Sequence, residues 1–161
     1  MQLELEGQRW QVINDGVMGG ISRSEVLPAG QGLEFRGHLS LENNGGFASI
    51  RRRFSENFSG VGSFRLKVRG DGRTYQFRLR ADDSSDGIAW RCGFTTDGSM
   101  RVIDLPLKNF EPVIRGRVVS NAGVLNPADI HWLGFMLADG RPGAFGLQVH
   151  AIEAVDVVET S

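Results

Sequence analysis

The strongest constraint on the fold is an alternation of apolar and polar residues with a period of two. In residues 64–69, which read FRLKVR, three apolar residues alternate with three basic ones. Residues 74–80, which read TYQFRLR, alternate in the same way, and the turn-forming segment Gly70-Asp71-Gly72 separates the two runs. Because side chains on a strand point alternately to opposite faces, each run predicts a strand with one buried face. Two such runs around a glycine-rich turn predict an antiparallel hairpin.

Looser alternation predicts further strands along the rest of the chain. We expect them at residues 33–41, 47–54, 89–95, 100–105, 130–137 and 144–158. The segment 139–143, DGRPG, lies between the last two and is predicted to form another hairpin turn. Helical periodicity is absent, and only short helical turns are expected, near residues 106–110 and 126–130. The sequence therefore predicts an all-β, antiparallel β-sandwich or jelly roll, with residues 1–161 as one domain.

Composition narrows the class of protein and of partner. Apolar residues make up 40% of the 161 residues, enough for a core, and the formal net charge of -1 argues against a nucleic-acid-binding protein. The single cysteine, Cys92, allows no internal disulfide, which favours a reducing compartment. The first residues do not resemble a signal peptide, and no apolar run approaches the roughly 20 residues of a membrane span. We therefore expect a soluble, cytoplasmic protein that does not span a membrane.

The sequence lacks the common patterns of catalytic and metal-binding residues. His38, His131 and His150 are far apart and do not have the spacing of zinc ligands. Cys92 lies in a predicted strand and is interpreted as a small core residue rather than a nucleophile. Neither a nucleophile elbow nor a phosphate-binding loop is present. The sequence predicts no enzyme activity, no cofactor and no metal.

One acidic loop leaves a second interpretation open. Asp82, Asp83 and Asp86 cluster in a segment whose oxygen atoms would suit calcium, with Asp15, Glu153 or Asp156 as further contributors. The spacing does not match an EF-hand, and such a cluster alone fixes no coordination geometry. A solvated loop is the favoured interpretation.

Half of the basic residues fall in one short stretch, between positions 51 and 80. These nine of the 18 lysines and arginines are Arg51, Arg52, Arg53, Arg65, Lys67, Arg69, Arg73, Arg78 and Arg80. The predicted hairpin would place residues 65, 67 and 69 on one sheet face with residues 78 and 80. Such a basic face suits either an acidic partner or a solvated surface with local ion pairs.

Two glycine-rich segments stand out before and between the strands. Residues 14–20 read NDGVMGG and residues 43–47 read NNGGF. Asparagine, aspartate and glycine tolerate positive φ, so both segments are explained as turns. Val17 and Met18 inside the first segment indicate a packed loop of fixed shape.

Together with their surroundings, these motifs resemble a known family. After Trp10 come NDGVMGGIS, FRGHLSLENNGGFASIR, RGDGRTYQFRLR, IDLPLKNFEPVIRGR, DIHWLGFMLAD and PGAFGLQVHAI. From Trp10 to Ile152 the chain resembles the complex I intermediate-associated protein 30 family. The resemblance implies a galactose-binding-domain-like jelly roll, related to carbohydrate-binding modules. It also implies a non-catalytic chaperone role, since mitochondrial members help to assemble respiratory complex I. The chain looks like a stand-alone, bacterial version.

The family motifs carry over to this chain residue by residue. They correspond here to Asn14, Asp15, Met18, Gly19 and Gly20; to Asn43, Asn44, Gly45, Gly46, Phe47 and then Arg51; to Gly70, Asp71, Gly72, Arg73 and Tyr75; and to Arg115 and Gly116. The candidate binding residues are Asn14, Asp15, Met18, Asn43, Asn44, Arg51, Arg65, Arg69, Asp71, Arg73, Arg78 and Arg115. A structural role is the alternative: Asp71 would cap its own turn, and buried asparagines would satisfy backbone groups of the loops.

Two functions follow from this reading. The first is a protein-binding assembly factor that holds an acidic or partly folded client on the basic sheet face, including peripheral association with a membrane complex. The alternative is a carbohydrate-binding module that uses the concave sheet face. Sugar sites need exposed aromatic platforms, for which Tyr75, Trp90 and Trp132 are the candidates, although Tyr75 belongs to an apolar face and is expected to be buried.

Overall fold

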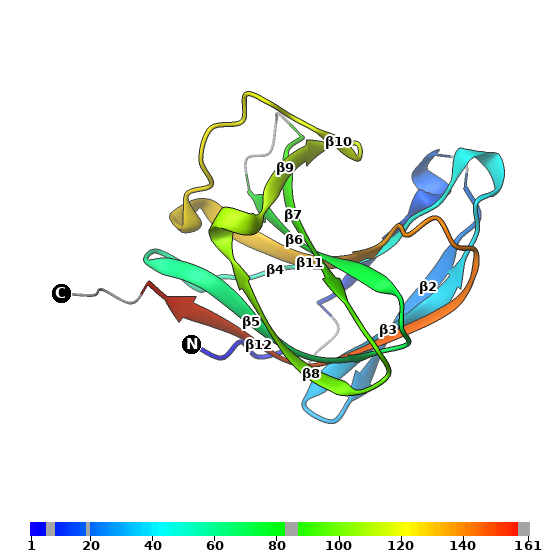
Figure 1. The fold of residues 1–161 in the computed structure, drawn as a ribbon, viewed down its shortest axis with the longest axis horizontal. Coiled ribbons are helices and arrows are strands. Elements are labelled where there is room, and N and C mark those ends of the chain that lie inside the picture. The colour runs from blue at the N-terminus through cyan, green and yellow to red at the C-terminus, as the bar shows by residue number, and fades with distance from the viewer. Residues whose placement is uncertain (6–8, 19, 83–86, 158–161) are drawn as a thin grey trace.

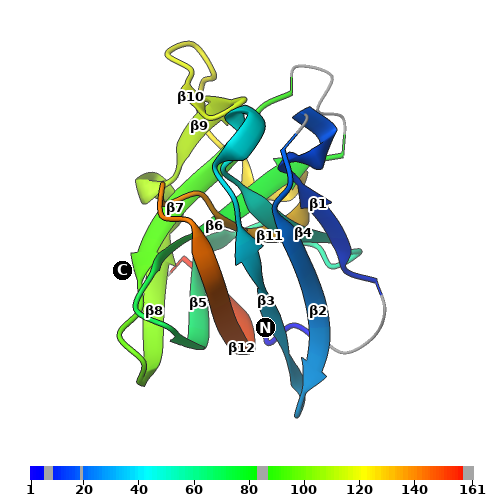
Figure 2. The same cartoon turned by 90° about the vertical axis from the view of Figure 1, so that its right-hand side faces the viewer.

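The computed structural model describes residues 1–5, 9–18, 20–82 and 87–157, and within these ranges the fold consists of two antiparallel β-sheets (Figure 1). The seven-stranded sheet has the order β1 (Gln11–Asn14), β4 (Ala48–Arg53), β11 (Ile130–Leu137), β6 (Thr74–Ala81), β7 (Ala89–Thr95), β9 (Glu111–Ile114) and β10 (Arg117–Val118). The five-stranded sheet has the order β2 (Arg23–Ala29), β3 (Gly32–Leu39), β12 (Gly143–Asp156), β5 (Val61–Gly70) and β8 (Met100–Pro106). Figure 2 shows β2, β3, β12 and β5 running side by side. The predicted antiparallel β-sandwich is confirmed.

All the predicted strands are present, and the strands that were not predicted lie at a sheet edge or next to one. β7 and β11 have the predicted bounds, and the other predicted strands differ by a few residues at their ends. β1, β2, β9 and β10 were not predicted, because they are short or lack a clean alternation. Single 3-10 turns at Leu107–Asn109 (η3) and Pro127–Asp129 (η4) confirm the two expected helical turns; η1 (Asp15–Met18) and η2 (Glu42–Asn44) were not predicted. None of the described helices is long or apolar enough to cross a bilayer.

The predicted pairing of β5 with β6 is wrong. β5 pairs with β12 and β8 in one sheet, whereas β6 pairs with β11 and β7 in the other. The connection at residues 70–72 therefore carries the chain across the core between the sheets. β11 and β12 also lie in different sheets, so residues 139–143 do not close a hairpin either. Alternation shows that a strand has one buried face, but it does not show which strand is its neighbour.

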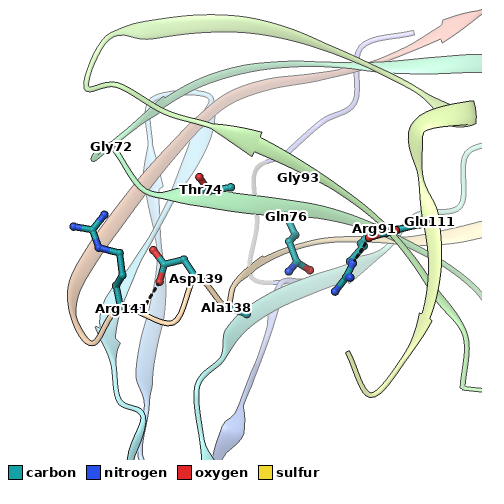
Figure 3. A pocket seen from close by; sticks show the side chains of 9 residues that line it. All are labelled: Gly72, Thr74, Gln76, Arg91, Gly93, Glu111, Ala138, Asp139 and Arg141. Atoms are coloured by element: carbon teal, nitrogen blue, oxygen red, sulfur yellow. Dashed lines mark hydrogen bonds and ion pairs between the residues drawn. The ribbon is translucent and has the colours of Figure 1, made fainter. Parts of the chain in front are cut away.

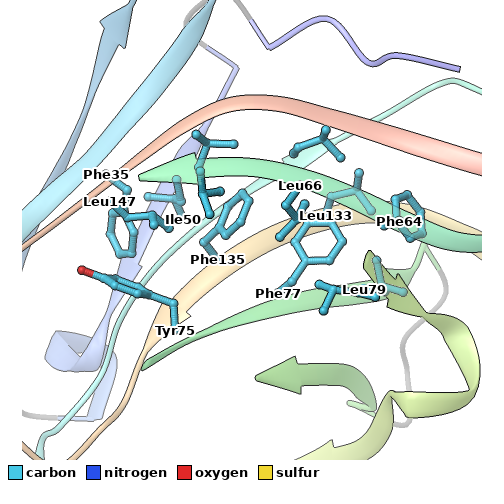
Figure 4. Close-up of a cluster of buried hydrophobic side chains, with 14 of the residues drawn as sticks. Phe35, Ile50, Phe64, Leu66, Tyr75, Phe77, Leu79, Leu133, Phe135 and Leu147 are labelled. Atoms are coloured by element: carbon cyan, nitrogen blue, oxygen red, sulfur yellow. The ribbon is translucent and has the colours of Figure 1, made fainter. Parts of the chain in front are cut away.

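The core fills the space between the two sheets and explains why β5 and β6 face each other. Their apolar faces meet across this space, with the rings of Phe64 and Phe77 centred 5.5 Å apart (Figure 4). The ring centre of Phe77 also lies 5.2 Å from that of Phe135 in β11 and 6.2 Å from that of Phe110. Burial of these apolar faces is the dominant favourable term in folding, and it favours the crossing connection over a hairpin.

This topology divides the basic stretch between two opposite surfaces. Arg65, Lys67 and Arg69 lie on the outer face of the five-stranded sheet, because their neighbours Phe64, Leu66 and Val68 point into the core. Arg78 and Arg80 alternate in the same way with the buried residues of β6 in the seven-stranded sheet. The expectation that all these residues share one face is therefore wrong.

Candidate functional site

The first two glycine-rich motifs meet at a single buried carboxylate. Asp15 is fully buried and accepts hydrogen bonds from the backbone N–H of Ser22 at 2.9 Å, the Ser22 hydroxyl at 2.6 Å and the N–H of Gly46 at 2.8 Å. Its own N–H donates to the carbonyl of Phe47 at 3.1 Å. Burial raises the pKa of the Asp15 carboxyl, and these hydrogen bonds outweigh burial, so its pKa lies below the ordinary value. The carboxylate thus ties the two loops together.

The same carboxylate explains why glycine occupies positions 20 and 45. A Cβ atom at Gly20 would lie 2.3 Å from the Asp15 Cγ, and one at Gly45 would lie 2.5 Å from the Asp15 Oδ2. Gly46 and Asn43 have φ of 134° and 57°, in the region that glycine and asparagine tolerate best. The interpretation of both motifs as turns of fixed shape is therefore confirmed for these residues.

The asparagines of the motifs differ in what they contact. The Asn14 carbonyl oxygen accepts hydrogen bonds from the Ser24 hydroxyl at 2.8 Å and the Ser49 N–H at 3.2 Å, so this side chain satisfies loop and strand groups as expected. Asn43 is exposed at the left-handed position. Gly19 and the side chains of Val17, Met18 and Asn44 lie outside the described residues.

The third motif holds the crossing between β5 and β6. Asp71 accepts hydrogen bonds from the N–H of Arg73 at 3.1 Å, the hydroxyl of buried Tyr75 at 3.0 Å and the N–H of Gly146 at 2.8 Å. Its predicted role as a cap of its own turn is confirmed. Arg73 pairs with Asp139 at 3.1 Å, and with 10% and 9% of their side chains exposed this pair is buried. Asp15, Asp71 and Arg73 thus connect the loops of the sandwich.

The outer face of the five-stranded sheet has its charge locally compensated around Arg65. Arg65 contacts Asp104 at 2.8 Å and Glu153 at 3.5 Å, and all three side chains are about half exposed. Exposed pairs of this kind contribute little to stability or to a binding surface. Arg69 is exposed on the same strand. For Arg65 the structure favours a solvated face with local ion pairs.

The outer face of the seven-stranded sheet carries a different arrangement, centred on Gly134. β11 lies between β4 and β6, and the cross-strand neighbours of Gly134 are Arg51 on one side and Arg78 on the other. A cavity of about 200 Å³ is lined by Gly134 and by the two arginines. Trp132 and Met136, two residues to either side on β11, also line this cavity. We call it the Gly134 cavity.

Two of the arginines that line this cavity, Arg51 and Arg78, have no paired carboxylate within the described part of the chain, and Arg80 lines it as well. Neither Arg51 nor Arg78 has a described carboxylate within 4 Å. Burial, together with the nearby charges of Arg91 and Arg80, lowers the pKa of Arg78 to about 10. Burial and Arg80 also lower the pKa of Arg51. The cavity is therefore a partly desolvated, electropositive site.

The two guanidinium groups use only part of their hydrogen-bonding capacity. Arg78 donates from Nη1 to the Gln76 side-chain oxygen at 2.8 Å and to the sulfur of Met136 at 3.3 Å. Arg51 stacks over the ring of Trp132, 5.1 Å from its centre, and its Nε is buried without a hydrogen-bond acceptor. Each guanidinium has five N–H donors, so donors remain for a ligand.

A second cavity, of about 460 Å³, lies on the same sheet face. Figure 3 shows Gln76 in this second cavity, between Asp139 on one side and the Arg91–Glu111 ion pair on the other. In that ion pair, the Arg91 Nε lies 2.9 Å from the Glu111 Oε1. Because Gln76 accepts the hydrogen bond from Arg78, it links the two cavities. In Figure 1 the strands β9 and β10 rise at one side of this sheet.

The aromatic candidates do not form a sugar platform. Tyr75 is fully buried, and Trp90 is half-buried against the core. Trp132 faces outward, but Arg51 covers one face of its ring and its Nε1–H donates to Asp82 at 3.0 Å. Trp90 and Trp132 therefore do not form the exposed, coplanar pair that would favour sugar binding.

The remaining candidates have local or peripheral roles. Cys92 is half-buried against the core, and burial raises the pKa of its thiol. Asp82 pairs with Arg53 at 2.9 Å, whereas Asp83 and Asp86 of the acidic loop lie outside the described residues. Arg115, with φ of 50°, is exposed at the turn between β9 and β10. The described residues contain no group of three or more side chains that could hold a metal ion.

The candidate site thus contains Arg51 and Arg78 of the predicted binding residues and lacks the others. Sequence reasoning missed Gly134 and Met136, and it considered Trp132 only as a sugar platform and not as a residue that lines this cavity beside Arg51. One signal was available: a glycine inside an apolar strand marks a close approach or an opening. The pairing of β11 between β4 and β6, which gives that glycine its meaning, was not predictable from local pattern.

Comparison with known proteins identifies both relatives and structural neighbours. The family model described as complex I intermediate-associated protein 30 matches residues 2–149. Two curated relatives, the probable mitochondrial complex I intermediate-associated proteins 30 of Caenorhabditis elegans and Caenorhabditis briggsae, are each 28% identical over 142 residues. These matches cover 84% of this chain and 41% of each relative, so the chain spans less than half of their length.

Solved structures resemble the fold over almost the whole chain. The family 11 carbohydrate-binding module of a Clostridium thermocellum cellulase has a TM-score of 0.69 at 14% identity, and the match covers 99% of this chain and 97% of that one. The same kind of module in complex with a β-1,3-1,4-mixed-linked tetrasaccharide has a TM-score of 0.66 at 15% identity, with 99% and 96% covered. A family 29 module has a TM-score of 0.58 at 12% identity, with 100% and 98% covered. At these identities the likeness is one of fold.

The first prediction concerns the loop junction. Gly20→Ala should lower the free energy of unfolding by about 2 kcal/mol or more, since the new methyl group would displace the hydrogen-bonded Asp15 carboxylate. Gly16→Ala is the matched control in the same motif: no atom lies within 4 Å of its Cβ position, and we expect a change within about 0.5 kcal/mol. Urea unfolding measures both, and equal effects would contradict the role assigned to Asp15.

The second prediction concerns the buried charge of the Gly134 cavity. Arg78→Met should raise the free energy of unfolding at pH 7 by about 1–2 kcal/mol, because it removes a desolvated cation from the neighbourhood of Arg80 and Arg91. The sign follows from the lowered pKa: below pH 10 Arg78 is charged in both states, and the folded state alone bears the cost. Arg69→Met, on the opposite surface, should change stability by less than about 0.5 kcal/mol. A loss of stability in Arg78→Met would show that Arg78 has a structural role instead.

Proposed function

Because this chain belongs to the complex I intermediate-associated protein 30 family, we propose that it is a non-catalytic protein-binding domain that helps to assemble a multi-subunit, respiratory-type complex. The observation that carries the proposal is the Gly134 cavity, where Arg51 and Arg78 face outward without a described carboxylate within 4 Å. A protein client presents carboxylates on its surface, and complementary charge both speeds encounter and selects the partner.

The chemistry of the cavity suits binding rather than proton transfer. Guanidinium groups keep their protons at neutral pH and act as fixed donors to anions. Apart from Arg80 and Ser49, the rest of the lining is apolar and includes Ile13, Trp132 and Met136. Buried aromatic residues and arginine are the residue types that dominate the energetics of protein interfaces. The cytoplasm remains the predicted compartment, and peripheral association with a membrane complex is part of the proposal.

Carbohydrate binding is the second candidate function. It is supported by the fold, because the structural neighbours are carbohydrate-binding modules and one was solved with a tetrasaccharide. A shared fold does not transfer a ligand, however, and the binding chemistry has to come from the site itself. The partly covered ring of Trp132 offers less stacking surface than a sugar platform requires.

The third prediction tests the proposed function and its surface together. The wild-type protein and an Arg51→Gln/Arg78→Gln variant would be used as bait in native cell extract, and captured proteins would be quantified by mass spectrometry. We expect subunits of one multi-subunit complex to be enriched by the wild type and reduced about tenfold or more with the variant, because two charge-assisted contacts are lost.

The matched control is Arg65→Gln/Arg69→Gln, which removes the same charge from the outer face of the five-stranded sheet. This control should capture the same subunits as the wild type. Both variants should keep the wild-type circular dichroism spectrum. Equal capture by both variants would remove the Gly134 cavity from the proposal, and binding of neutral glucan oligosaccharides by the wild type would favour the carbohydrate alternative.

A further inference from the structure

The geometry of the Gly134 cavity restricts the ligand to a small group held between two cations. Arg51 and Arg78 stand on strands that flank β11, with Gly134 directly between them. Adjacent strands lie about 4.8 Å apart, so the two arginine backbones are separated by roughly 10 Å. Side chains of this length can converge on one group above Gly134 from opposite sides. The cavity volume of about 200 Å³ suits a side chain rather than a chain of sugar rings.

The charges of Arg51 and Arg78 favour an anion as the ligand of this cavity. A desolvated guanidinium without a paired carboxylate is costly, and a bound anion offsets that cost for both arginines at once. The Nε of Arg51 is buried without an acceptor among the described residues, which adds to the cost of this cation, and a ligand would be bound by its other N–H donors. A planar carboxylate matches the fork of guanidinium donors.

The apolar part of the lining indicates what the anion is attached to. Ile13, Trp132 and Met136 surround the arginines with hydrocarbon, aromatic and thioether groups. A carboxylate on a short methylene stem, next to an apolar side chain, would bury its apolar atoms here. A phosphate dianion would lose more hydration in such surroundings. An acidic sugar would need a free aromatic face, and Arg51 already covers one face of the Trp132 ring.

Resting on the proposed protein-binding function, we propose that the Gly134 cavity is a carboxylate site for one glutamate or aspartate side chain of the client, flanked by an apolar residue. Arg51 and Arg78 bind the carboxylate, and Trp132 and Met136 contact the apolar neighbour. The second cavity, beside Gln76, lies along the path of the continuing client chain.

The test uses the full chain and two short, terminally blocked peptides. One carries a central glutamate between two leucines, and the other has glutamine in its place, so the pair differs only in the charge. We expect the glutamate peptide to bind at least about tenfold more tightly by calorimetry, because only it makes charge-assisted hydrogen bonds. Its titration should shift the Nε–H resonances of Arg51 and Arg78 in the NMR spectrum.

Single substitutions show which arginines contribute to the affinity for the glutamate peptide. Arg51→Gln and Arg78→Gln should each weaken the glutamate peptide about tenfold, whereas Arg69→Gln, on the other sheet, should change its affinity less than about twofold. Raising the salt concentration should weaken the glutamate peptide and leave the glutamine peptide nearly unchanged. Equal affinities of the two peptides, or equal effects of the three variants, would overturn the carboxylate site.

Three further outcomes separate this inference from the proposed function or overturn it. If client capture depends on Arg51 and Arg78 while the glutamate peptide does not bind, the carboxylate assignment is wrong and the proposed function stands. If an oligogalacturonate binds and the glutamate peptide does not, the site is one for acidic glycans and the inference is overturned. If the peptide binds as expected but client capture is the same in all variants, the carboxylate site is supported. The proposed assembly role through the outer face of the seven-stranded sheet is then wrong.

Discussion

The meeting of two apolar sheet faces is the constraint on which the rest of this structure depends. β5 and β6 follow each other in sequence, yet their apolar sides face each other across the core, with Phe64 and Phe77 in contact. A hairpin would have placed both apolar sides on one surface of one sheet, whereas the crossing buries each against the other. The crossing in turn needs a connection of fixed shape, which Asp71 supplies by binding Tyr75 and Gly146. The outward faces of the two sheets are left free to differ in chemistry.

Residues that hold the loops and the core together are distinct from residues on the outward sheet faces. For this reason the family motifs and the candidate binding site consist of different residues. The glycine-rich motifs are explained by loop closure around Asp15, whose carboxylate leaves no room for a Cβ at Gly20 or Gly45. Their presence therefore identifies the fold and says little about a ligand. The proposed ligand site lies instead on the sheet face, where Arg51 and Arg78 are brought together by a strand from a distant part of the chain. A shared scaffold with variable face chemistry is how one fold serves unrelated partners.

Local pattern predicted the strands well and their partners poorly, for a physical reason. Alternation in residues 64–69 and 74–80 reports the burial of one face, which is the same in a hairpin and in a crossing between sheets. The predicted grouping of Arg65 and Arg69 with Arg78 failed on this point alone. Asp71 was predictable as a turn cap because one of its hydrogen-bond donors, the N–H of Arg73, belongs to its own turn. The contact of Asp15 with Gly46, and the place of Gly134 between two arginines, join segments more than 30 residues apart and need the topology first.

The Gly134 cavity also poses an energetic question that the fold alone does not answer. A methionine or leucine at position 78 would pack on the apolar lining without the desolvation that lowers the pKa of Arg78 to about 10. Glycine at position 134 follows from backbone packing, because a Cβ there would lie 2.5 Å from the Ile50 carbonyl oxygen. The arginines on either side do not follow from packing, since nothing in the core needs their charge. A cost that stability does not explain is expected at a binding site, where the ligand supplies the missing interaction. We therefore place the proposed binding face where Arg51 and Arg78 have no described carboxylate within 4 Å, rather than where the family motifs lie.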